Sequence, residues 1–298
     1  MFIWKSLLLH SMKSMLAEKI IKAFDADNAS KPISELKDSA NESSLGRWVP
    51  FLTLHLLGLS AFFFEPSQDV IILFFALYFV RMFVITGFYH RYFAHRAFKT
   101  SRLVQFIFAF IGSTSCQRGA LWWASHHRHH HKYSDKPEDI HSPVASGFWW
   151  SHIGWITCEK NIPTDYERIK DFTCFPELVW LNRFDWVPVV ILNLVLLCIG
   201  GPKWVAWCFL STVVLFHCTC LINSLAHISG SRTYETEDSS RNNFVLALIT
   251  LGEGWHNNHH KYPHYVNQGQ KFFEMDITYL ILKAMSFVGL VWDLRTKR

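Results

Sequence analysis

Four long apolar stretches constrain the fold of this chain more than any other feature of its sequence. They occupy residues 48–64, 70–88, 184–199 and 204–222. An α-helix needs about 20 predominantly apolar residues to cross the hydrocarbon core of a bilayer. Because 50% of the residues are hydrophobic and only 18% are charged, a soluble domain of this length is a poor alternative. The sequence therefore predicts an all-α integral membrane protein.

Turn-forming segments divide the four stretches into two hairpins. Residues 65–69 (Glu-Pro-Ser-Gln-Asp) separate the first pair, and residues 200–203 (Gly-Gly-Pro-Lys) separate the second. Trp48, Trp186 and Trp204 stand at the ends of stretches, where indole rings anchor helices at the membrane interface. We therefore expect four transmembrane helices. The first and third stretches are short, so each alone could instead be a buried core helix.

The remaining segments are expected outside the bilayer. Residues 103–111 are apolar but too short to span, and we expect them to lie at the interface. Residues 277–292 are expected to form a last helix that packs on the domain or the interface. Residues 1–46 are polar and lack the features of a cleaved signal peptide. We expect residues 1–46 to be a loose cytoplasmic extension and residues 47–298 to be the membrane domain.

The distribution of positive charge predicts the orientation in the membrane. Almost no positive charge lies in the turns within the hairpins, whereas the connections between them carry Arg91, Arg96, Lys99, Arg102, Arg118, Arg128, Lys132, Lys160, Arg168, Lys170 and Arg183. By the positive-inside rule these connections and both termini face the cytoplasm. The net charge is only +5 and the basic residues form no long run. We therefore predict a lipid bilayer as partner and no nucleic acid.

Most of the 17 histidines gather in four short segments just outside the apolar stretches: residues 90–95, 125–131, 223–227 and 256–260. Positions i, i+3 and i+4 share a helix face, so the histidines at 127, 130 and 131 are expected to point together, as are those at 256, 259 and 260. Asn223 and His227 are likewise one turn apart. His90 and His95 are five residues apart, about 140° around an ideal helix. They are therefore not expected to share a face unless the helix is locally distorted, and would more easily serve two different metals than chelate one.

The number of clustered imidazoles predicts more than one metal ion. A zinc ion takes at most four protein ligands, so nine converging imidazoles from these segments fit two ions. Imidazole suits iron, zinc, copper and nickel, so ligand type alone does not identify the metal. Residues 126–131 alone could instead be a metal-buffering loop. We expect His10, His55, His152 and His217, which stand apart, to be ordinary satisfied polar residues.

Three histidine boxes and their surroundings resemble those of membrane fatty acyl desaturases. The boxes are His-Arg-Tyr-Phe-Ala-His at 90–95, His-Arg-His-His-His at 127–131 and His-Asn-Asn-His-His at 256–260. The similarity extends through residues 121–124, 139–141, 147–155, 223–227 and 250–255. Within that family, the sequence resembles the stearoyl-CoA desaturase type in its bacterial form. It implies four transmembrane helices in two hairpins under a cytoplasmic helical cap that holds two iron ions.

The resemblance also implies individual roles for the clustered residues. Its metal ligands correspond to His90, His95, His127, His130, His131, His227, His256, His259 and His260, with Asn223 acting through water. Helical spacing would equally allow His126, His129 and His130 in the second box. The family pattern of Arg after the first ligand and a basic then an aromatic residue after the last selects the register that begins at His127. Glu253, Asp135 and Asp139 are candidates to orient ligand imidazoles by accepting their second ring N–H.

The implied reaction is dioxygen-dependent formation of a cis double bond, expected at carbon 9 of a saturated long-chain acyl-CoA. Trp123 and Thr219 match family positions beside the acyl tunnel. Acyl-CoA members carry two basic residues where this chain has Glu159 and Lys160. Lys160 is therefore the remaining head-group candidate, and an acyl-lipid substrate is the alternative.

Other functions and a further partner follow from the same residues. A hydroxylase on the same scaffold is the nearest enzymatic alternative. A histidine-rich metal transporter is disfavoured, because transport requires ionisable residues within the spans and the clusters lie outside them. The chain has no His-Pro-Gly-Gly haem motif and no CxxC pattern. We therefore expect a separate electron donor, such as ferredoxin or cytochrome b5 with its reductase.

Overall fold

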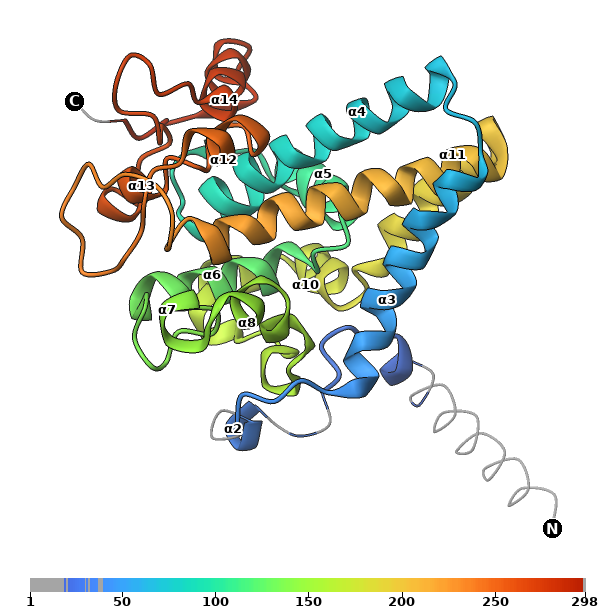
Figure 1. Cartoon of the computed structure of the whole chain (residues 1–298), viewed down its shortest axis with the longest axis horizontal. Helices are drawn as coiled ribbons and strands as arrows, with labels where there is room; N and C mark the ends of the chain where they lie inside the picture. The colour runs from blue at the N-terminus through green and yellow to red at the C-terminus, as the bar shows by residue number, and fades with distance from the viewer. Residues whose placement is uncertain (1–18, 20, 30, 32, 37–39, 297–298) are drawn as a thin grey trace.

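Long helices dominate the computed structural model, which describes residues 19, 21–29, 31, 33–36 and 40–296 (Figure 1). The first half of the chain contains α2 (Ile33–Leu36), α3 (Leu45–Leu59), η1 (Ser60–Phe63), α4 (Gln68–Phe83), η2 (Val84–Ala94), β1 (Lys99–Thr100), α5 (Arg102–Ser113), α6 (Ala120–Tyr133), α7 (Pro143–Ser146) and α8 (Phe148–His152). The second half contains η3 (Gly154–Thr157), η4 (Glu159–Asn161), η5 (Tyr166–Ile169), α9 (Lys170–Thr173), α10 (Pro176–Arg183), α11 (Trp186–Leu225), α12 (Phe244–Ile249), α13 (His256–Lys261), α14 (Ile277–Phe287) and β2 (Val291–Trp292).

Three helical segments of the described chain are long and apolar enough to cross a membrane. They are Leu45–Phe63, Gln68–Ala94 and Trp186–Leu225. Only 11% of the first segment is buried, against 50% of the second and 39% of the third. The first segment therefore presents almost its whole apolar surface to its surroundings, as a helix in contact with lipid does.

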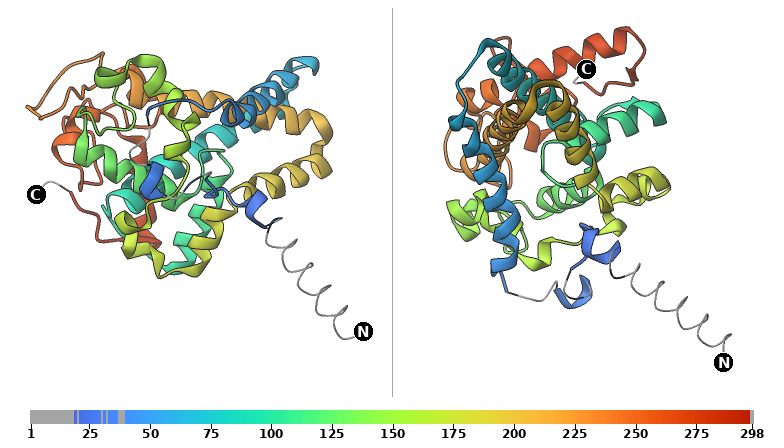
Figure 2. Two further views of the ribbon diagram at one scale, coloured as in Figure 1. Left: turned by 90° about the horizontal axis from the view of Figure 1, so that it is seen from below. Right: turned by 90° about the vertical axis from the view of Figure 1, so that its right-hand side faces the viewer.

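The third segment contains both the third and the fourth apolar stretches. Its helix is interrupted at Gly201, which has φ 69° and ψ −166° and is followed by Pro202. The ribbon turns back at this point, so that the two arms of α11 lie side by side (Figure 2). Glycine allows the positive φ at no steric cost, and proline removes a helical N–H.

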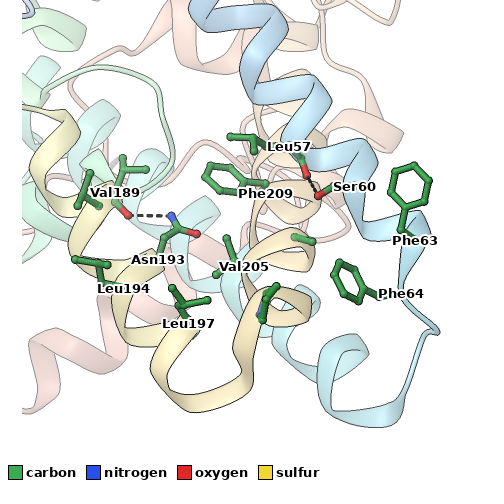
Figure 3. Close-up of a pocket in the computed structure, with 13 residues that line it drawn as sticks. Leu57, Ser60, Phe63, Phe64, Val189, Asn193, Leu194, Leu197, Val205 and Phe209 are labelled. Atoms are coloured by element: carbon green, nitrogen blue, oxygen red, sulfur yellow. Dashed lines mark hydrogen bonds between the residues drawn. The ribbon is translucent and has the colours of Figure 1, made fainter.

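A groove opens beside this turn, between the two arms of α11 and the end of α3 (Figure 3). Its volume is about 590 Å³, and its walls are almost entirely apolar. Asn193 is the main polar side chain there, and its amide donates to the Val189 carbonyl at 2.8 Å.

The expected last helix ends earlier than the sequence predicted. α14 stops at Phe287, and Gly289 adopts a φ of 76°. The chain then extends as β2, which pairs antiparallel with β1. The expectation of a helix to residue 292 was therefore wrong, because a left-handed glycine terminates it.

Part of the segment that was expected to be loose contacts the rest of the protein. Ser44 N–H donates to the Thr157 carbonyl at 2.9 Å, and Arg47 pairs with Glu159 at 2.8 Å. Leu36 is buried. The contacts of Leu36 and Ser44 lie before residue 47, where we expected the membrane domain to begin.

The elements that carry the clustered histidines lie together at one end of the long helices (Figure 1). They are η2, α6, the end of α11, and α13. The buried core centres on η2, where Phe88, Tyr89 and Phe93 are less than 1% exposed. Seven of the nine clustered histidines therefore stand on packed helices, and His95 and His227 lie in the turns directly after η2 and α11.

Candidate metal centre

A π-helix brings the first two box histidines together. In η2 the turn is wider than in an α-helix, and residues five apart come into register. The His95 N–H donates to the His90 carbonyl at 3.2 Å, and the two ring centroids are 4.8 Å apart. The expectation that these residues would serve two different metals assumed α-helical geometry. The structure places them in one group.

The helices α6 and α13 each divide their three histidines between two groups. His127 and His131 are in one group and His130 is in the other. Likewise, His256 and His260 are together, and His259 is apart. Residues at i and i+4 differ by about 40° around a helix, whereas i+3 lies about 60° to the other side. A helix between two sites can therefore serve both, so the expectation that each trio points together was wrong.

Nine imidazoles form two compact groups whose nitrogen atoms lie within 4.8 Å of one another. The five-histidine group contains His90, His95, His127, His131 and His259. The four-histidine group contains His130, His227, His256 and His260. His126 and His129 lie outside both, since their ring nitrogens contact the carbonyls of Trp122 (2.9 Å) and Glu138 (2.7 Å).

The ring nitrogens within the groups face one another in a way that suits a cation. The Nε2 of His259 lies 3.0 Å from that of His90 and 2.9 Å from that of His131. The Nδ1 of His90 contacts the Glu253 carboxylate, which can only accept, so the proton of a neutral His90 is on Nδ1 and its Nε2 presents a lone pair. Converging lone pairs repel unless a positive charge lies between them. The donor set therefore fits a metal ion.

The four-histidine group shows the same arrangement. The Nδ1 of His227 lies 3.1 Å from Asp135, and its Nε2 lies 3.0 Å from the Nε2 of His256. The Nδ1 atoms of His256 and His259 and the Nε2 of His260 are buried without a hydrogen-bond partner among the described residues. Unpartnered buried polar atoms are costly. An ion at Nε2 of His260 would remove part of that cost.

Burial keeps most of these imidazoles neutral and able to bind a metal. Together with the neighbouring imidazoles, it holds the pKa well below the ordinary histidine range for five of them: His95, His127, His131, His256 and His259. Burial also lowers the pKa of His260 to about 4, against the opposing effect of Asp238. His130 differs, because Asp139 outweighs burial and raises its pKa.

Carboxylates contact the second ring nitrogen of several clustered imidazoles. The predicted contacts are confirmed for Asp135 with His227, for Asp139 with the Nδ1 of His130 at 3.0 Å, and for Glu253 with His90. Burial alone would raise the pKa of Glu253, but its contact with His90 and the positive charge of Arg91 lower it to about 2. The carboxylate is therefore ionised at neutral pH.

Three further residues that contact the clustered imidazoles or their carboxylate partners were not predicted. Asp238 contacts the Nδ1 of His260 at 2.6 Å, Gln268 donates to Glu253 at 3.0 Å, and the buried Arg91 pairs with Glu253 at 2.9 Å. Asp238 comes from the loop between α11 and α12, where its neighbours in sequence are also polar. Only the position of Arg91 inside the first box could have indicated its role.

A small cavity lies beside the histidines. Its volume is about 40 Å³, and it is lined by Ile85, Thr86, His90, Trp123, His127, His130, Thr219, Ile222, Asn223, Thr250, Glu253 and His256. The predicted residues Trp123, Thr219 and Asn223 therefore meet at the metal groups. Lys160 lies in η4 and is not among the lining residues of the described chain.

The isolated histidines have other partners, as predicted. His55 contacts the Phe51 carbonyl at 2.7 Å and the Nε2 of His217 at 2.8 Å. The other ring nitrogen of His217 lies 3.0 Å from His152, which also contacts Ser224. These three histidines link α3, α11 and α8. His10 lies outside the described residues.

Comparison with known proteins identifies the class to which this fold and site belong. The family model described as fatty acid desaturase matches residues 69–278. This chain therefore belongs to the fatty acid desaturase family, and the resemblance inferred from the histidine boxes is confirmed. It is a membrane oxidoreductase of fatty acid metabolism.

Similar proteins include both lipid desaturases and acyl-CoA desaturases. The chain is 37% identical to the sn-1 stearoyl-lipid 9-desaturase of Synechocystis sp., an alignment that covers 82% of this chain and 78% of that protein. It is 36% identical to an acyl-CoA 5-desaturase of Anemone leveillei, over 81% of this chain and 76% of that protein. It is 33% identical to the sn-2 palmitoyl-lipid 9-desaturase of Nostoc sp., over 82% of this chain and 88% of that protein.

Proposed function

We propose that this chain is a dioxygen-dependent di-iron desaturase that introduces a cis double bond at carbon 9 of a saturated long-chain acyl group. The observation that carries the proposal is the pair of imidazole groups that line one small cavity. One iron belongs to each group. The ligands are the nine histidines of the five- and four-histidine groups, with Asn223 acting through water.

The chemistry requires a strong oxidant, because methylene C–H bonds offer no acidic proton to a general base. The two irons, when bound, supply the activation of dioxygen. The four electrons that reduce dioxygen to two water molecules come in equal parts from the acyl chain and from an external donor. We propose a ferredoxin, or cytochrome b5 with its reductase, as that donor.

The protein's own residues hold the acyl chain and the imidazoles in place. Trp123 and Thr219 line the cavity together with His90, His127 and His130. A chain threaded between Trp123 and Thr219 would have its methylene carbons beside both groups, which is the positioning such a reaction needs. The carboxylates of Asp135, Asp139 and Glu253 hold the Nδ1 protons, and so aim the opposite nitrogens inward.

We further propose four membrane spans with the metal centre and both termini on the cytoplasmic side. The break at Gly201 supports division of Trp186–Leu225 into two spans. The positive charges of the connections support the orientation. The α6 and α13 elements then form part of a cytoplasmic cap.

The acyl carrier is proposed to be a membrane lipid, with acyl-CoA as the second candidate. Glu159 occupies one of the two expected basic positions and pairs with Arg47, which leaves Lys160 without its basic neighbour. The Synechocystis and Nostoc relatives are named as lipid 9-desaturases. The Anemone relative, named as an acyl-CoA desaturase, supports the alternative.

Heterologous expression with fatty-acid profiling tests this function. We expect lipids with a cis double bond at carbon 9, and none from a matched His127→Ala variant. In membranes supplied with labelled stearoyl-lipid or stearoyl-CoA, the carrier desaturated first identifies the substrate. Hydroxylated product in place of the alkene would overturn desaturation in favour of the hydroxylase alternative. Turnover by purified protein with NAD(P)H alone would exclude the external donor.

A further inference from the structure

A short part of the N-terminal region is anchored at the junction of α10 and α11. The Ala26 N–H donates to the Arg183 carbonyl at 2.7 Å, and the Trp186 indole donates to the Phe24 carbonyl at 2.9 Å. Phe24 also packs on the Trp186 ring, with centroids 5.5 Å apart. Backbone contacts thus fix the path of this segment. They bring the next side chain, Asp27, to the protein interior.

The Asp27 carboxylate accepts hydrogen bonds from four side chains. Tyr166 donates at 2.6 Å, Thr164 at 2.7 Å, Asn182 at 3.2 Å and Arg118 at 3.3 Å. The Asp27 side chain is 12% exposed, and Asn182 is 1% exposed. Removal of one partner in such a buried network leaves the donors unsatisfied. Asp27 is therefore an integral part of this packing.

The same network ends at the first turn of α6. The N-cap of α6 is Gly119, which has no side chain to accept a helix N–H. Instead the Asn182 Oδ1 accepts the Trp122 N–H at 2.7 Å. A Cβ at position 119 would lie 2.5 Å from that oxygen, so glycine is needed for this approach. Asn182, a residue of α10, thus provides the N-terminal cap that α6 lacks.

Asp27 orients Asn182 for this role. The Asn182 amide nitrogen donates to Asp27, to Thr164 at 2.9 Å and to Tyr166 at 3.2 Å. These contacts leave the amide oxygen pointing at α6. Arg118, which Asp27 also binds, lies 5.2 Å over the Trp122 ring. Asp27 is therefore linked to the start of α6 through two residues, Asn182 and Arg118. This helix bears Trp123, His127, His130 and His131.

We propose that Asp27 is a positioning residue for the desaturase: through Asn182 and Arg118, it fixes the first turn of α6 and thereby the cavity wall and histidines that this helix presents. The inference rests on the proposed function only for its kinetic consequence. Its structural part concerns the α6 amides alone.

The Asp27→Ala variant tests this in two ways, on full-length protein in detergent. Hydrogen exchange of the amides at residues 120–126 should become about fivefold faster, as expected for loss of a cap, while exchange in residues 70–80 of α4 stays unchanged. The kcat should fall about tenfold, and the KM for the acyl substrate should stay within about twofold. Glu35→Ala, which removes an exposed carboxylate from the same region, is the matched control and should change neither.

A double-mutant cycle identifies the path. If Asp27 acts in part through Asn182, Asp27→Ala accelerates the exchange of the α6 amides less in the Asn182→Ala background than in wild-type protein, because only the effect carried by Arg118 remains there. If the double variant accelerates the exchange of the α6 amides by the product of the two single effects, the inference is overturned. If Asp27→Ala does not yield folded protein, Asp27→Asn replaces it, with about a threefold change in exchange expected because it keeps one oxygen acceptor.

The two proposals fail separately. If wild-type protein makes no desaturated product, the proposed function is wrong. The exchange data still test whether Asp27 fixes the first turn of α6. If wild-type protein is active and the α6 exchange of Asp27→Ala matches that of wild type, the inference about Asp27 is wrong.

Discussion

The imidazoles of this protein differ in what their second ring nitrogen contacts. His90, His130, His227 and His260 each place Nδ1 on a carboxylate. A carboxylate holds the Nδ1 proton and leaves Nε2 free to bind a metal. His126 instead places Nδ1 on a helix carbonyl within its own chain segment. Which histidines can serve a metal is therefore decided by their contacts as much as by their spacing.

Alanine variants of the second box test the register. We expect His127→Ala and His131→Ala to abolish desaturation, because both lie in the five-histidine group. His126→Ala and His129→Ala should retain a measurable fraction, since loss of an outer group costs about 10- to 100-fold or less. Product formation is measured at matched membrane expression. Dead His126 and His129 variants beside active His127 and His131 variants would show that the register is wrong.

The contact of Asp238 with His260, which the sequence did not predict, can be tested by substitution. Removing its carboxylate frees the His260 ring from its 2.6 Å contact. We expect Asp238→Ala to reduce activity and iron affinity about 10- to 100-fold. Glu237→Ala is the control, because that neighbouring carboxylate is 91% exposed. Equal iron content and equal activity in the two variants would contradict the assignment.

Among the elements, η2 and α5 depend on each other through one close approach. The Tyr89 ring, one residue before His90, lies against Gly112 of α5. Tyr89 also donates to the Ala109 carbonyl at 3.2 Å. The π-helical turn that groups His90 with His95 is thus supported by a neighbouring helix with no side chain at that position.

The Gly112→Ala variant tests this support. A Cβ there would lie 2.2 Å from the nearest Tyr89 ring carbon, so the ring or the helix must shift. We expect a loss of about 1–3 kcal/mol in the free energy of unfolding, and reduced iron content because His90 moves. Gly46→Ala is the control, since the nearest atom to its Cβ would lie 3.9 Å away. Unchanged thermal stability and iron content in Gly112→Ala would show that the approach is not needed.

Across the whole molecule, the exposed apolar surface and the buried histidines lie at different ends of the long helices. Apolar surface is exposed along α3, α4 and the first arm of α11, whereas the elements that carry the buried imidazoles lie together at the other end (Figure 1). Elements from residue 90 to residue 260 contribute to that end. The two histidine groups therefore join parts of the chain that lie far apart in the sequence.

Metal removal should consequently lower the stability of the entire protein. Without a cation, the Nε2 atoms of His90, His131 and His259 face one another at 2.9–3.0 Å as lone pairs. We expect chelation to lower the Tm, since a ligand present at about 100 times its Kd stabilises by roughly 2.7 kcal/mol. The Tm of His131→Ala should respond less to chelation. A wild-type Tm unaffected by verified iron removal would contradict a structural role for the metals.

Local features of the sequence determined the membrane class, the positions of the apolar helices and the four histidine clusters, whereas the family resemblance selected the nine ligands among them. These features are local because hydropathy over about 20 residues and helical spacing act within one segment. The turn at Gly201 was predictable for the same reason, since glycine followed by proline interrupts a helix wherever it occurs.

Only the tertiary structure decided how the imidazoles are shared and which residues support them. The grouping of His90 with His95 depends on a π-helix, which packing against α5 and α6 stabilises and which no propensity in the box predicts. The contacts of Asp238 with His260 and of Asp27 with Asn182 join residues 22 and 155 positions apart. Such pairs carry no periodic signal, because their partners meet only after the helices between them have packed.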